Sequence, residues 1–126
     1  TLTGACVVAL GEEVAGVMSN NQGWCEQVLA AGKGAGEDLW LFPIFDVYDD
    51  LTKGEAGNSK NRGARGGGAI SAAKFLQRFV AQTPWVHVDI AGPAFASSAK
   101  PHREAGATGA YVKTLVELVR RQGSSD

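Results

Sequence analysis

The spacing of apolar residues predicts strands and helices in alternation along the chain. Residues 14–19 contain β-branched positions and lead into the turn sequence NNQG, a pattern typical of a strand. In residues 22–35 the apolar positions cluster at helical spacing and glycines close the segment, which predicts a helix. Residues 39–45 form an apolar extended stretch, in which Pro43 indicates an edge strand or a strand end. The apolar block at residues 4–11 fits either a buried helix or a strand.

A short helix and a polar loop are predicted in the middle of the chain. In residues 46–54, Asp46 is expected as the N-cap and Gly54 as the stop. A glycine-rich polar loop follows at residues 57–68.

The last third predicts two helices around one buried strand. The clearest helix covers residues 69–82, and the near-continuous apolar run at 85–92 predicts a strand in a sheet covered on both faces. After a polar loop at 94–109, a final helix is predicted over 110–121. The residues expected on the buried faces of the two helices are Ile70, Ala73, Leu76 and Val80, and Tyr111, Leu115, Leu118 and Val119.

Alternating strands and helices place the chain in the α/β class, and 126 residues suit a single unit. The formal net charge of −1 argues against nucleic acid or an anionic membrane as a partner. The apolar runs are too short to span a bilayer, and no signal peptide is visible. Cys6 and Cys25 form no CxxC pair, so we expect two reduced, buried thiols in an intracellular protein.

His87 and Asp89 are the first candidates for chemistry, because positions two apart in a strand share a face. A zinc site needs at least three protein ligands, and this pair offers two, with His102 in a separate loop. We therefore favour a core interpretation, in which His87 is hydrogen-bonded to backbone and Asp89 anchors nearby N–H groups. On this interpretation the chain contains no metal ligand.

Glycine-rich stretches are the second candidates, because a helix start favours anions. The sequence GARGGGAIS matches neither the P-loop pattern nor GxGxxG after a strand, and GKGAG fails the same tests. We expect these glycines to allow close packing instead. With no GxSxG elbow either, local chemistry predicts no complete active site.

Five stretches, in matching order and spacing, resemble the M17 leucyl aminopeptidases, a family of dinuclear metallopeptidases. They are TLTGA with the apolar run ending in ALG, LWLFPIFDVYDD, KNRGARGGGAISAAKFLQRFV, WVHVDIAGPAF and ATGAYVKTLVEL. The resemblance implies that residues 1–126 are the C-terminal portion of a three-layer α/β/α catalytic domain with a mixed sheet. The family's metal ligands come mainly from two motifs expected upstream, one with a Lys and an Asp and one of the form NTDAEGRL, and both are absent from this sequence.

The resemblance assigns a site role to only a few residues of this chain. Thr1, Leu2, Thr3 and Gly4 match a segment that borders the bound peptide, and Ala91 and Ala94 match positions lining the pocket for its N-terminal side chain. His87 and Asp89 match a stretch, HxDIAG, that is structural in the family. No catalytic residue is expected within the chain.

The parent protein is accordingly expected to be a metalloaminopeptidase that removes N-terminal residues from peptides. It would take two divalent metal ions, zinc or manganese, assemble as a hexamer and work inside the cell, in the cytoplasm or an organelle. The isolated chain would be inactive. An alternative is a non-catalytic, aminopeptidase-like structural subunit, suggested by the missing motifs and by Gly57, where relatives usually carry Asp. A third alternative is an anion-binding module that uses the glycine loop.

Overall fold

A mixed sheet forms the centre of the computed structural model, which describes residues 1, 3–53 and 66–124. Among these residues, β1 (Ala15–Ser19), β2 (Leu39–Leu41) and β3 (Val86–Asp89) lie in the order β2-β1-β3. β1 and β2 are parallel, with Ala15 opposite Leu39, whereas β1 and β3 are antiparallel, with Met18 opposite His87. The parallel pair is joined by a helical crossover, as parallel strands require.

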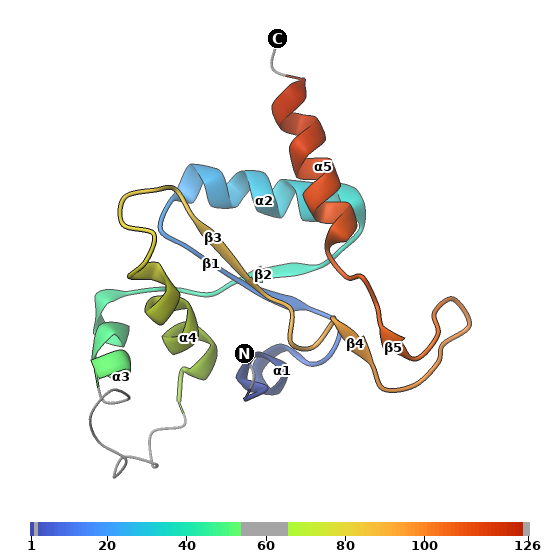
Figure 1. Ribbon diagram of the computed structural model, residues 1–126, viewed down its shortest axis with the longest axis horizontal. Helices are drawn as coiled ribbons and strands as arrows, with labels where there is room; N and C mark the ends of the chain where they lie inside the picture. The colour runs from blue at the N-terminus through green and yellow to red at the C-terminus, as the bar shows by residue number, and fades with distance from the viewer. Residues whose placement is uncertain (2, 54–65, 125–126) are drawn as a thin grey trace.

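Helices cover both faces of this sheet (Figure 1). α2 (Gln22–Ala35) and α5 (Val112–Gly123) pack against each other on one face. α1 (Ala5–Leu10) and α4 (Gly68–Gln77) lie on the other. The expected three-layer α/β/α arrangement is confirmed, and the ambiguous segment at residues 4–11 is a helix.

Each face of the sheet has its own apolar core, because side chains alternate along a strand. Met18 packs with Ile70 and Ala73 under α4, and Trp85 packs at the margin of this cluster. The opposite core joins buried residues of α2 and α5 to the partly buried side chains of Val86 and Val88. His87 and Asp89 therefore face the layer that contains α1 and α4.

The short helix predicted after β2 has a different start. Residues Asp46–Tyr48 form a 3-10 helix, η1, which continues into α3 (Asp49–Lys53). The N-cap position is Phe45, so the prediction of Asp46 as N-cap is wrong. The Asp46 carboxylate instead lies 3.8 Å from the buried ammonium of Lys74, which also contacts Asp49 at 3.1 Å. The expected stop at Gly54 and most of the glycine loop fall outside the described residues.

The helix predicted over residues 69–82 is α4, and it ends earlier, at Gln77. Beyond it, the amides of residues 78–80 bond to carbonyls three positions back, and Ala81 has a positive φ of 49°. The α-helical hydrogen bonding thus ends at Gln77, and tighter turns with bonds three positions back follow it before Pro84. Ile70 and Ala73 are buried as predicted, but Leu76 is 41% exposed.

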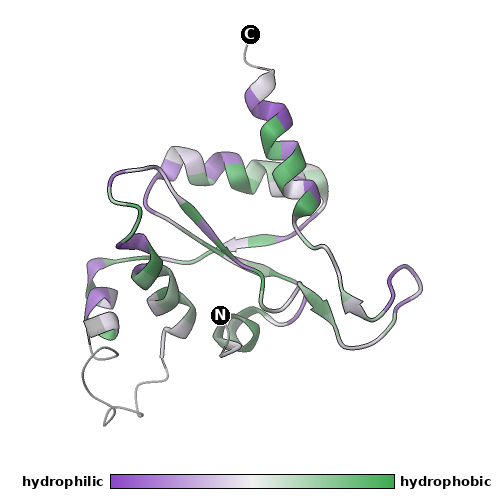
Figure 2. Cartoon of the chain, in the orientation of Figure 1, coloured by the Kyte–Doolittle hydropathy of each residue, from purple (hydrophilic) through white to green (hydrophobic). Residues whose placement is uncertain are grey.

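Two features of the C-terminal third differ from the sequence prediction. The loop at 94–109 contains a small hairpin of β4 (Phe95–Ala96) and β5 (Gly106–Ala107). In α5, Leu118 and the N-cap Tyr111 are buried, whereas Leu115 and Val119 are 58% and 70% exposed. Apolar and polar residues are interleaved along this helix in Figure 2. The exposed apolar residues of α5, which we call the α5 apolar stripe, are Val112, Leu115, Val116 and Val119.

Glycines serve close packing at two of the stretches considered for anion binding. A Cβ on Gly68 would lie 2.8 Å from that of Ala5, which brings α4 against α1. A Cβ on Gly32 would lie 2.6 Å from Leu39 Cδ1, which brings α2 against β2. The packing interpretation is confirmed for these two glycines. Within the described part of the chain, no helix combines the length and apolar character that crossing a membrane requires.

Candidate site: two segments joined by Asp89

The two segments expected to border the substrate, residues 1–4 and 91–94, meet at one carboxylate oxygen. The terminal ammonium of Thr1 pairs with Asp89 Oδ1 at 2.7 Å, and the amide of Ala91 donates to the same oxygen at 3.1 Å. Figure 1 shows the N-terminus and α1 beside the connection from β3 to β4. The Asp89 side chain is fully buried, and its predicted role as an anchor for N–H groups is confirmed.

Further contacts hold the same two segments together. The Cys6 thiol of α1 lies 3.9 Å from the carbonyl oxygen of Asp89. A Cβ on Gly92 would lie 2.7 Å from the carbonyl oxygen of Gly11, so the chain after β3 passes directly over the end of α1. Sequence patterns did not indicate these roles for Cys6 and Gly92, because each contact joins residues about 80 positions apart.

Ala94 is held by the turn and the hairpin that follow β3. Its amide donates to the carbonyl of Ile90 at 2.9 Å, and its own carbonyl accepts from the amide of Thr108 at 3.0 Å. The Thr108 hydroxyl donates to the carbonyl of Pro93 at 2.6 Å. Ala91 and Ala94 are both half-buried. Thr108 was missed as a supporting residue because a single Thr in a polar loop carries no local signal.

The remaining residues of the first segment lie near the surface. Thr1 is half-buried, and Thr3 is exposed. Gly4 adopts a φ of 73° as the N-cap of α1, a conformation that favours glycine. Leu2 lies outside the described residues.

The charge of Asp89 is set by two opposing effects. Burial raises the pKa of its carboxyl, but hydrogen bonds from the terminal ammonium of Thr1 and the Ala91 amide, together with the ammonium's charge, outweigh it, and the pKa lies below the ordinary value. Burial also lowers the pKa of His87, which favours the neutral imidazole. The site thus contains one carboxylate and one neutral ring.

His87 differs from the prediction in one respect. Its Nε2 is buried and finds no hydrogen-bond partner among the described residues, so the expected bond to backbone is not present at that atom. The ring stacks against Trp85 instead, with 6.0 Å between ring centroids and 22° between planes. The contact with Trp85 thus helps to place this side chain.

The described residues do not fit a metal centre. Within residues 1, 3–53 and 66–124 there is no group of three or more His, Cys, Asp or Glu side chains arranged to hold a metal ion. Oδ1 of Asp89 already accepts two hydrogen bonds, which leaves His87 and one carboxylate oxygen as a pair at most. Any metal of the parent protein would need ligands from elsewhere.

Both cysteines are free and buried, as expected. Burial is the main cause that raises the pKa of each thiol, and the negative charge of Asp89 adds to the effect at Cys6. Neither thiol has the lowered pKa typical of a reactive cysteine.

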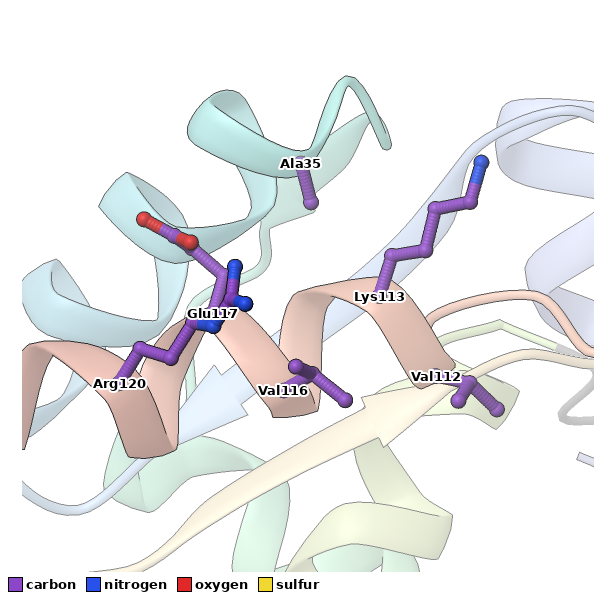
Figure 3. Close-up of a pocket in the computed structure, with 6 residues that line it drawn as sticks. All are labelled: Ala35, Val112, Lys113, Val116, Glu117 and Arg120. Carbon is purple, nitrogen blue, oxygen red and sulfur yellow. The ribbon is translucent and has the colours of Figure 1, made fainter.

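Two hollows in the surface lie away from the joined segments. One, of about 260 Å³, lies between the end of α2 and the start of α5 (Figure 3). The other, of about 570 Å³, follows β2 and the end of α2. The first is lined by Ala35, Val112, Lys113, Val116, Glu117 and Arg120. Because Glu117 is already paired with Arg121, this hollow offers no free acid–base pair.

The family of the chain follows from its sequence relatives. A model of the cytosol aminopeptidase family, catalytic domain, matches residues 1–116. The chain belongs to this family. A probable cytosol aminopeptidase of Rhodopirellula baltica is 57% identical over 120 residues, which cover 94% of this chain and 24% of that relative. The chain thus spans about a quarter of the length of such family members.

Solved structures of cytosol aminopeptidase relatives share the fold. A mutant of tomato leucine aminopeptidase matches with a TM-score of 0.79 and 37% identity, over 94% of this chain and 23% of that one. The bottromycin maturation enzyme BotP in complex with Mn matches with a TM-score of 0.82 and 32% identity, over 95% of this chain and 27% of that one. The resemblance to the M17 leucyl aminopeptidases is confirmed.

Proposed function

We propose that the chain is the C-terminal portion of the catalytic domain of a metalloaminopeptidase that removes N-terminal residues from peptides. The observation that carries the proposal is the contact between the start of the chain and the segment after β3, where Gly92 lies against the carbonyl oxygen of Gly11 and the Cys6 thiol against that of Asp89. These are the same two segments that the family resemblance assigns to the substrate.

In this proposal residues 1–4 and 91–94 form two walls of one pocket. Thr1, Leu2, Thr3 and Gly4 border the bound peptide, while Ala91 and Ala94 lie where its N-terminal side chain ends. Two alanines leave space for that side chain because each contributes one methyl group. Their half-buried positions support this role, since a pocket wall must be rigid and still reach solvent.

Exposed apolar surface supports a larger unit around these residues. The α5 apolar stripe is open to solvent, and Trp40 and Leu41 of β2 are 63% and 52% exposed. Surfaces of this kind are usually covered by other protein. We propose that the remainder of a longer chain covers part of them and that copies assemble as a hexamer.

The proposed enzyme takes two divalent metal ions, zinc or manganese, with ligands supplied from outside the described residues. The manganese named with BotP supports the use of a divalent metal in the family. The name of the relatives, cytosol aminopeptidase, supports an intracellular location.

The first test is activity of the full-length protein that contains this chain. We expect hydrolysis of leucyl amide that needs a divalent metal and is abolished by a chelator. A folded full-length protein that shows no such hydrolysis would refute the enzyme and favour the structural-subunit alternative.

The second test fills the pocket with Ala94→Phe. A larger side chain there should clash with a long apolar substrate, and overpacking costs roughly 1–3 kcal/mol. We therefore expect kcat/KM for leucyl amide to fall about ten- to hundredfold, with a much smaller loss for alanyl amide. Ala99→Phe, at an exposed position of the loop between β4 and β5, is the matched control and should change neither. Equal losses on both substrates would place the effect in folding and not in the pocket.

A further inference from the structure

The α5 apolar stripe is a second apolar face on a helix that is already packed. Leu118 of α5 is buried with Val28 and Ala31 of α2 on one side of the helix. The four stripe residues are spaced three or four positions apart, so they form one continuous face, and each is more than half exposed. An exposed apolar face of this kind marks a site of contact with other protein.

Two cations border the stripe. Lys113 is three positions before Val116 and Arg120 is four positions after it, and both residues are exposed. Figure 3 shows them on either side of Val116 along the helix. Neither forms an ion pair with another residue in the described part of the chain, since Glu117 is taken by Arg121. The stripe is therefore an apolar surface with a basic border.

An exposed apolar surface with the opposite charge lies at η1 and α3. Phe45 and Val47 are 67% and 69% exposed, and carboxylates alternate with them and follow them in the two short helices. The ammonium of Lys74, which is shared by two of these carboxylates, balances only one of their charges. We call this surface the η1–α3 acidic face; its residues are Phe45, Asp46, Val47, Asp49 and Asp50.

The two surfaces cannot meet within one copy of the chain. α3 packs on α4 and α5 packs on α2, on opposite faces of the sheet and at opposite ends of the molecule in Figure 1. Contact between the α5 stripes of two copies would bring their cations together, which like-charge repulsion disfavours. The stripe of one copy and the acidic face of another are complementary, because each has an apolar centre and their borders have opposite charge.

We propose that the α5 apolar stripe of one copy docks on the η1–α3 acidic face of the next copy. Because the two surfaces differ, the contact is heterologous, and its repetition closes a ring when the rotation between copies allows it. A closed ring accounts for the proposed hexamer, either as one ring of six or as two rings of three. The inference rests on that proposed assembly and does not depend on catalytic activity.

The experiment follows dissociation of the full-length protein on dilution, by mass photometry. Arg120→Glu and Asp46→Arg each bring like charges together at the contact, and the two changes combined exchange the charges. Val119→Asp places a charge in the apolar centre. Lys33→Glu is the matched control, because it makes the same change of charge at an exposed position of α2, outside both surfaces.

We expect Arg120→Glu, Asp46→Arg and Val119→Asp each to raise the dissociation constant of the assembly about tenfold or more. The combined variant should return to within about threefold of wild type, because opposite charges again face each other. Lys33→Glu should leave the dissociation constant unchanged. Circular dichroism should show folded subunits throughout, since each changed side chain is exposed and Lys74 keeps Asp49 as its partner in Asp46→Arg.

The remaining outcomes overturn the contact. Single reversals that dissociate the assembly no more than Lys33→Glu does, or a combined variant that does not recover, would contradict it, and so would a monomeric wild type. Variants that unfold instead of dissociating would assign the stripe to the rest of the longer chain and overturn the proposal as well. Chelator-sensitive hydrolysis of leucyl amide is measured separately, so an assembled but inactive protein would refute the proposed enzyme and leave the contact standing.

Discussion

The start of α5 depends on a carboxylate from another element, and replacing that carboxylate should destabilise the protein. Glu37 follows α2, and its Oε2 accepts from the amide of Tyr111 at 2.6 Å. Its Oε1 accepts from both the amide and the hydroxyl of Thr114, each at 2.9 Å. These amides belong to the first turn of α5, where no intrahelical acceptor exists. Glu37 thus caps a helix 74 positions away in the sequence.

The effect of Glu37→Ala can be estimated from the groups left without an acceptor. Thr114 is 2% exposed and Tyr111 is 6% exposed, so water reaches their donors poorly. Loss of an N-cap costs about 0.5–2 kcal/mol, and an unsatisfied buried donor about 1–3 kcal/mol. Tyr111 also holds a φ of 67°, which is unfavourable for a residue with a side chain. We expect the free energy of unfolding to fall by about 2 kcal/mol in urea denaturation followed by circular dichroism.

The pH dependence gives a second signature of the same cap. Burial alone would raise the pKa of Glu37, but the hydrogen bonds from Tyr111 and Thr114 outweigh it and hold the pKa below its ordinary value of 4.5. A carboxyl with a lowered folded-state pKa stabilises the protein above its unfolded pKa. The difference between wild type and Glu37→Ala should therefore be constant above about pH 5.5 and shrink as the pH falls through and below 4.5.

Glu117→Ala is the matched control, because it removes the same charge from α5 itself. Glu117 pairs with Arg121 at 2.9 Å on the partly exposed side of the helix, and such i,i+4 pairs contribute only about 0.3–0.5 kcal/mol. If Glu37→Ala costs no more than Glu117→Ala, or its cost persists unchanged at pH 3, the capping argument is wrong.

Two further predictions concern close packing and the thiols. Gly92→Ala should destabilise the protein by about 1–3 kcal/mol in thermal denaturation, because the new methyl group would lie 2.7 Å from the backbone oxygen of Gly11. Gly123→Ala, in α5 with open space around it, should be neutral or slightly stabilising, and equal losses in both would contradict the contact. Cys6 and Cys25 should resist iodoacetamide at pH 8 until the protein is denatured, because burial raises the pKa of both thiols. Peptide mapping by mass spectrometry checks this, and rapid labelling of either native thiol would contradict the buried assignment.

Local periodicity determined most elements and the fold class. The helix at residues 22–35 has the predicted bounds, and the strands at 15–19 and 86–89 lie within the predicted segments. These predictions succeed because helix and strand periods, turn residues and caps are properties of neighbouring positions. The alternation along β3 indicated that His87 and Asp89 share a face, and the predicted hydrogen bond from a nearby N–H group to Asp89 is present at Ala91.

Tertiary packing decided which helix residues are buried and where several elements begin and end, because these depend on contacts between distant parts of the chain. The contact of α5 with α2 buries Leu118, whereas Leu115 stays exposed with the rest of the α5 apolar stripe. The N-cap of η1, the early end of α4 and the hairpin of β4 and β5 also depend on surroundings that the sequence pattern does not contain.

The candidate site shows the same division. Sequence alone placed Asp89 and His87 on one face of a strand, but it could not show that the Cys6 thiol lies against the Asp89 carbonyl or that Nε2 of His87 finds no partner among the described residues. The same holds for Glu37 and the start of α5. A residue's type and spacing fix which groups it can bond and which way it points along its own element. Which distant backbone meets it is fixed only when the chain folds and sets both segments in one place.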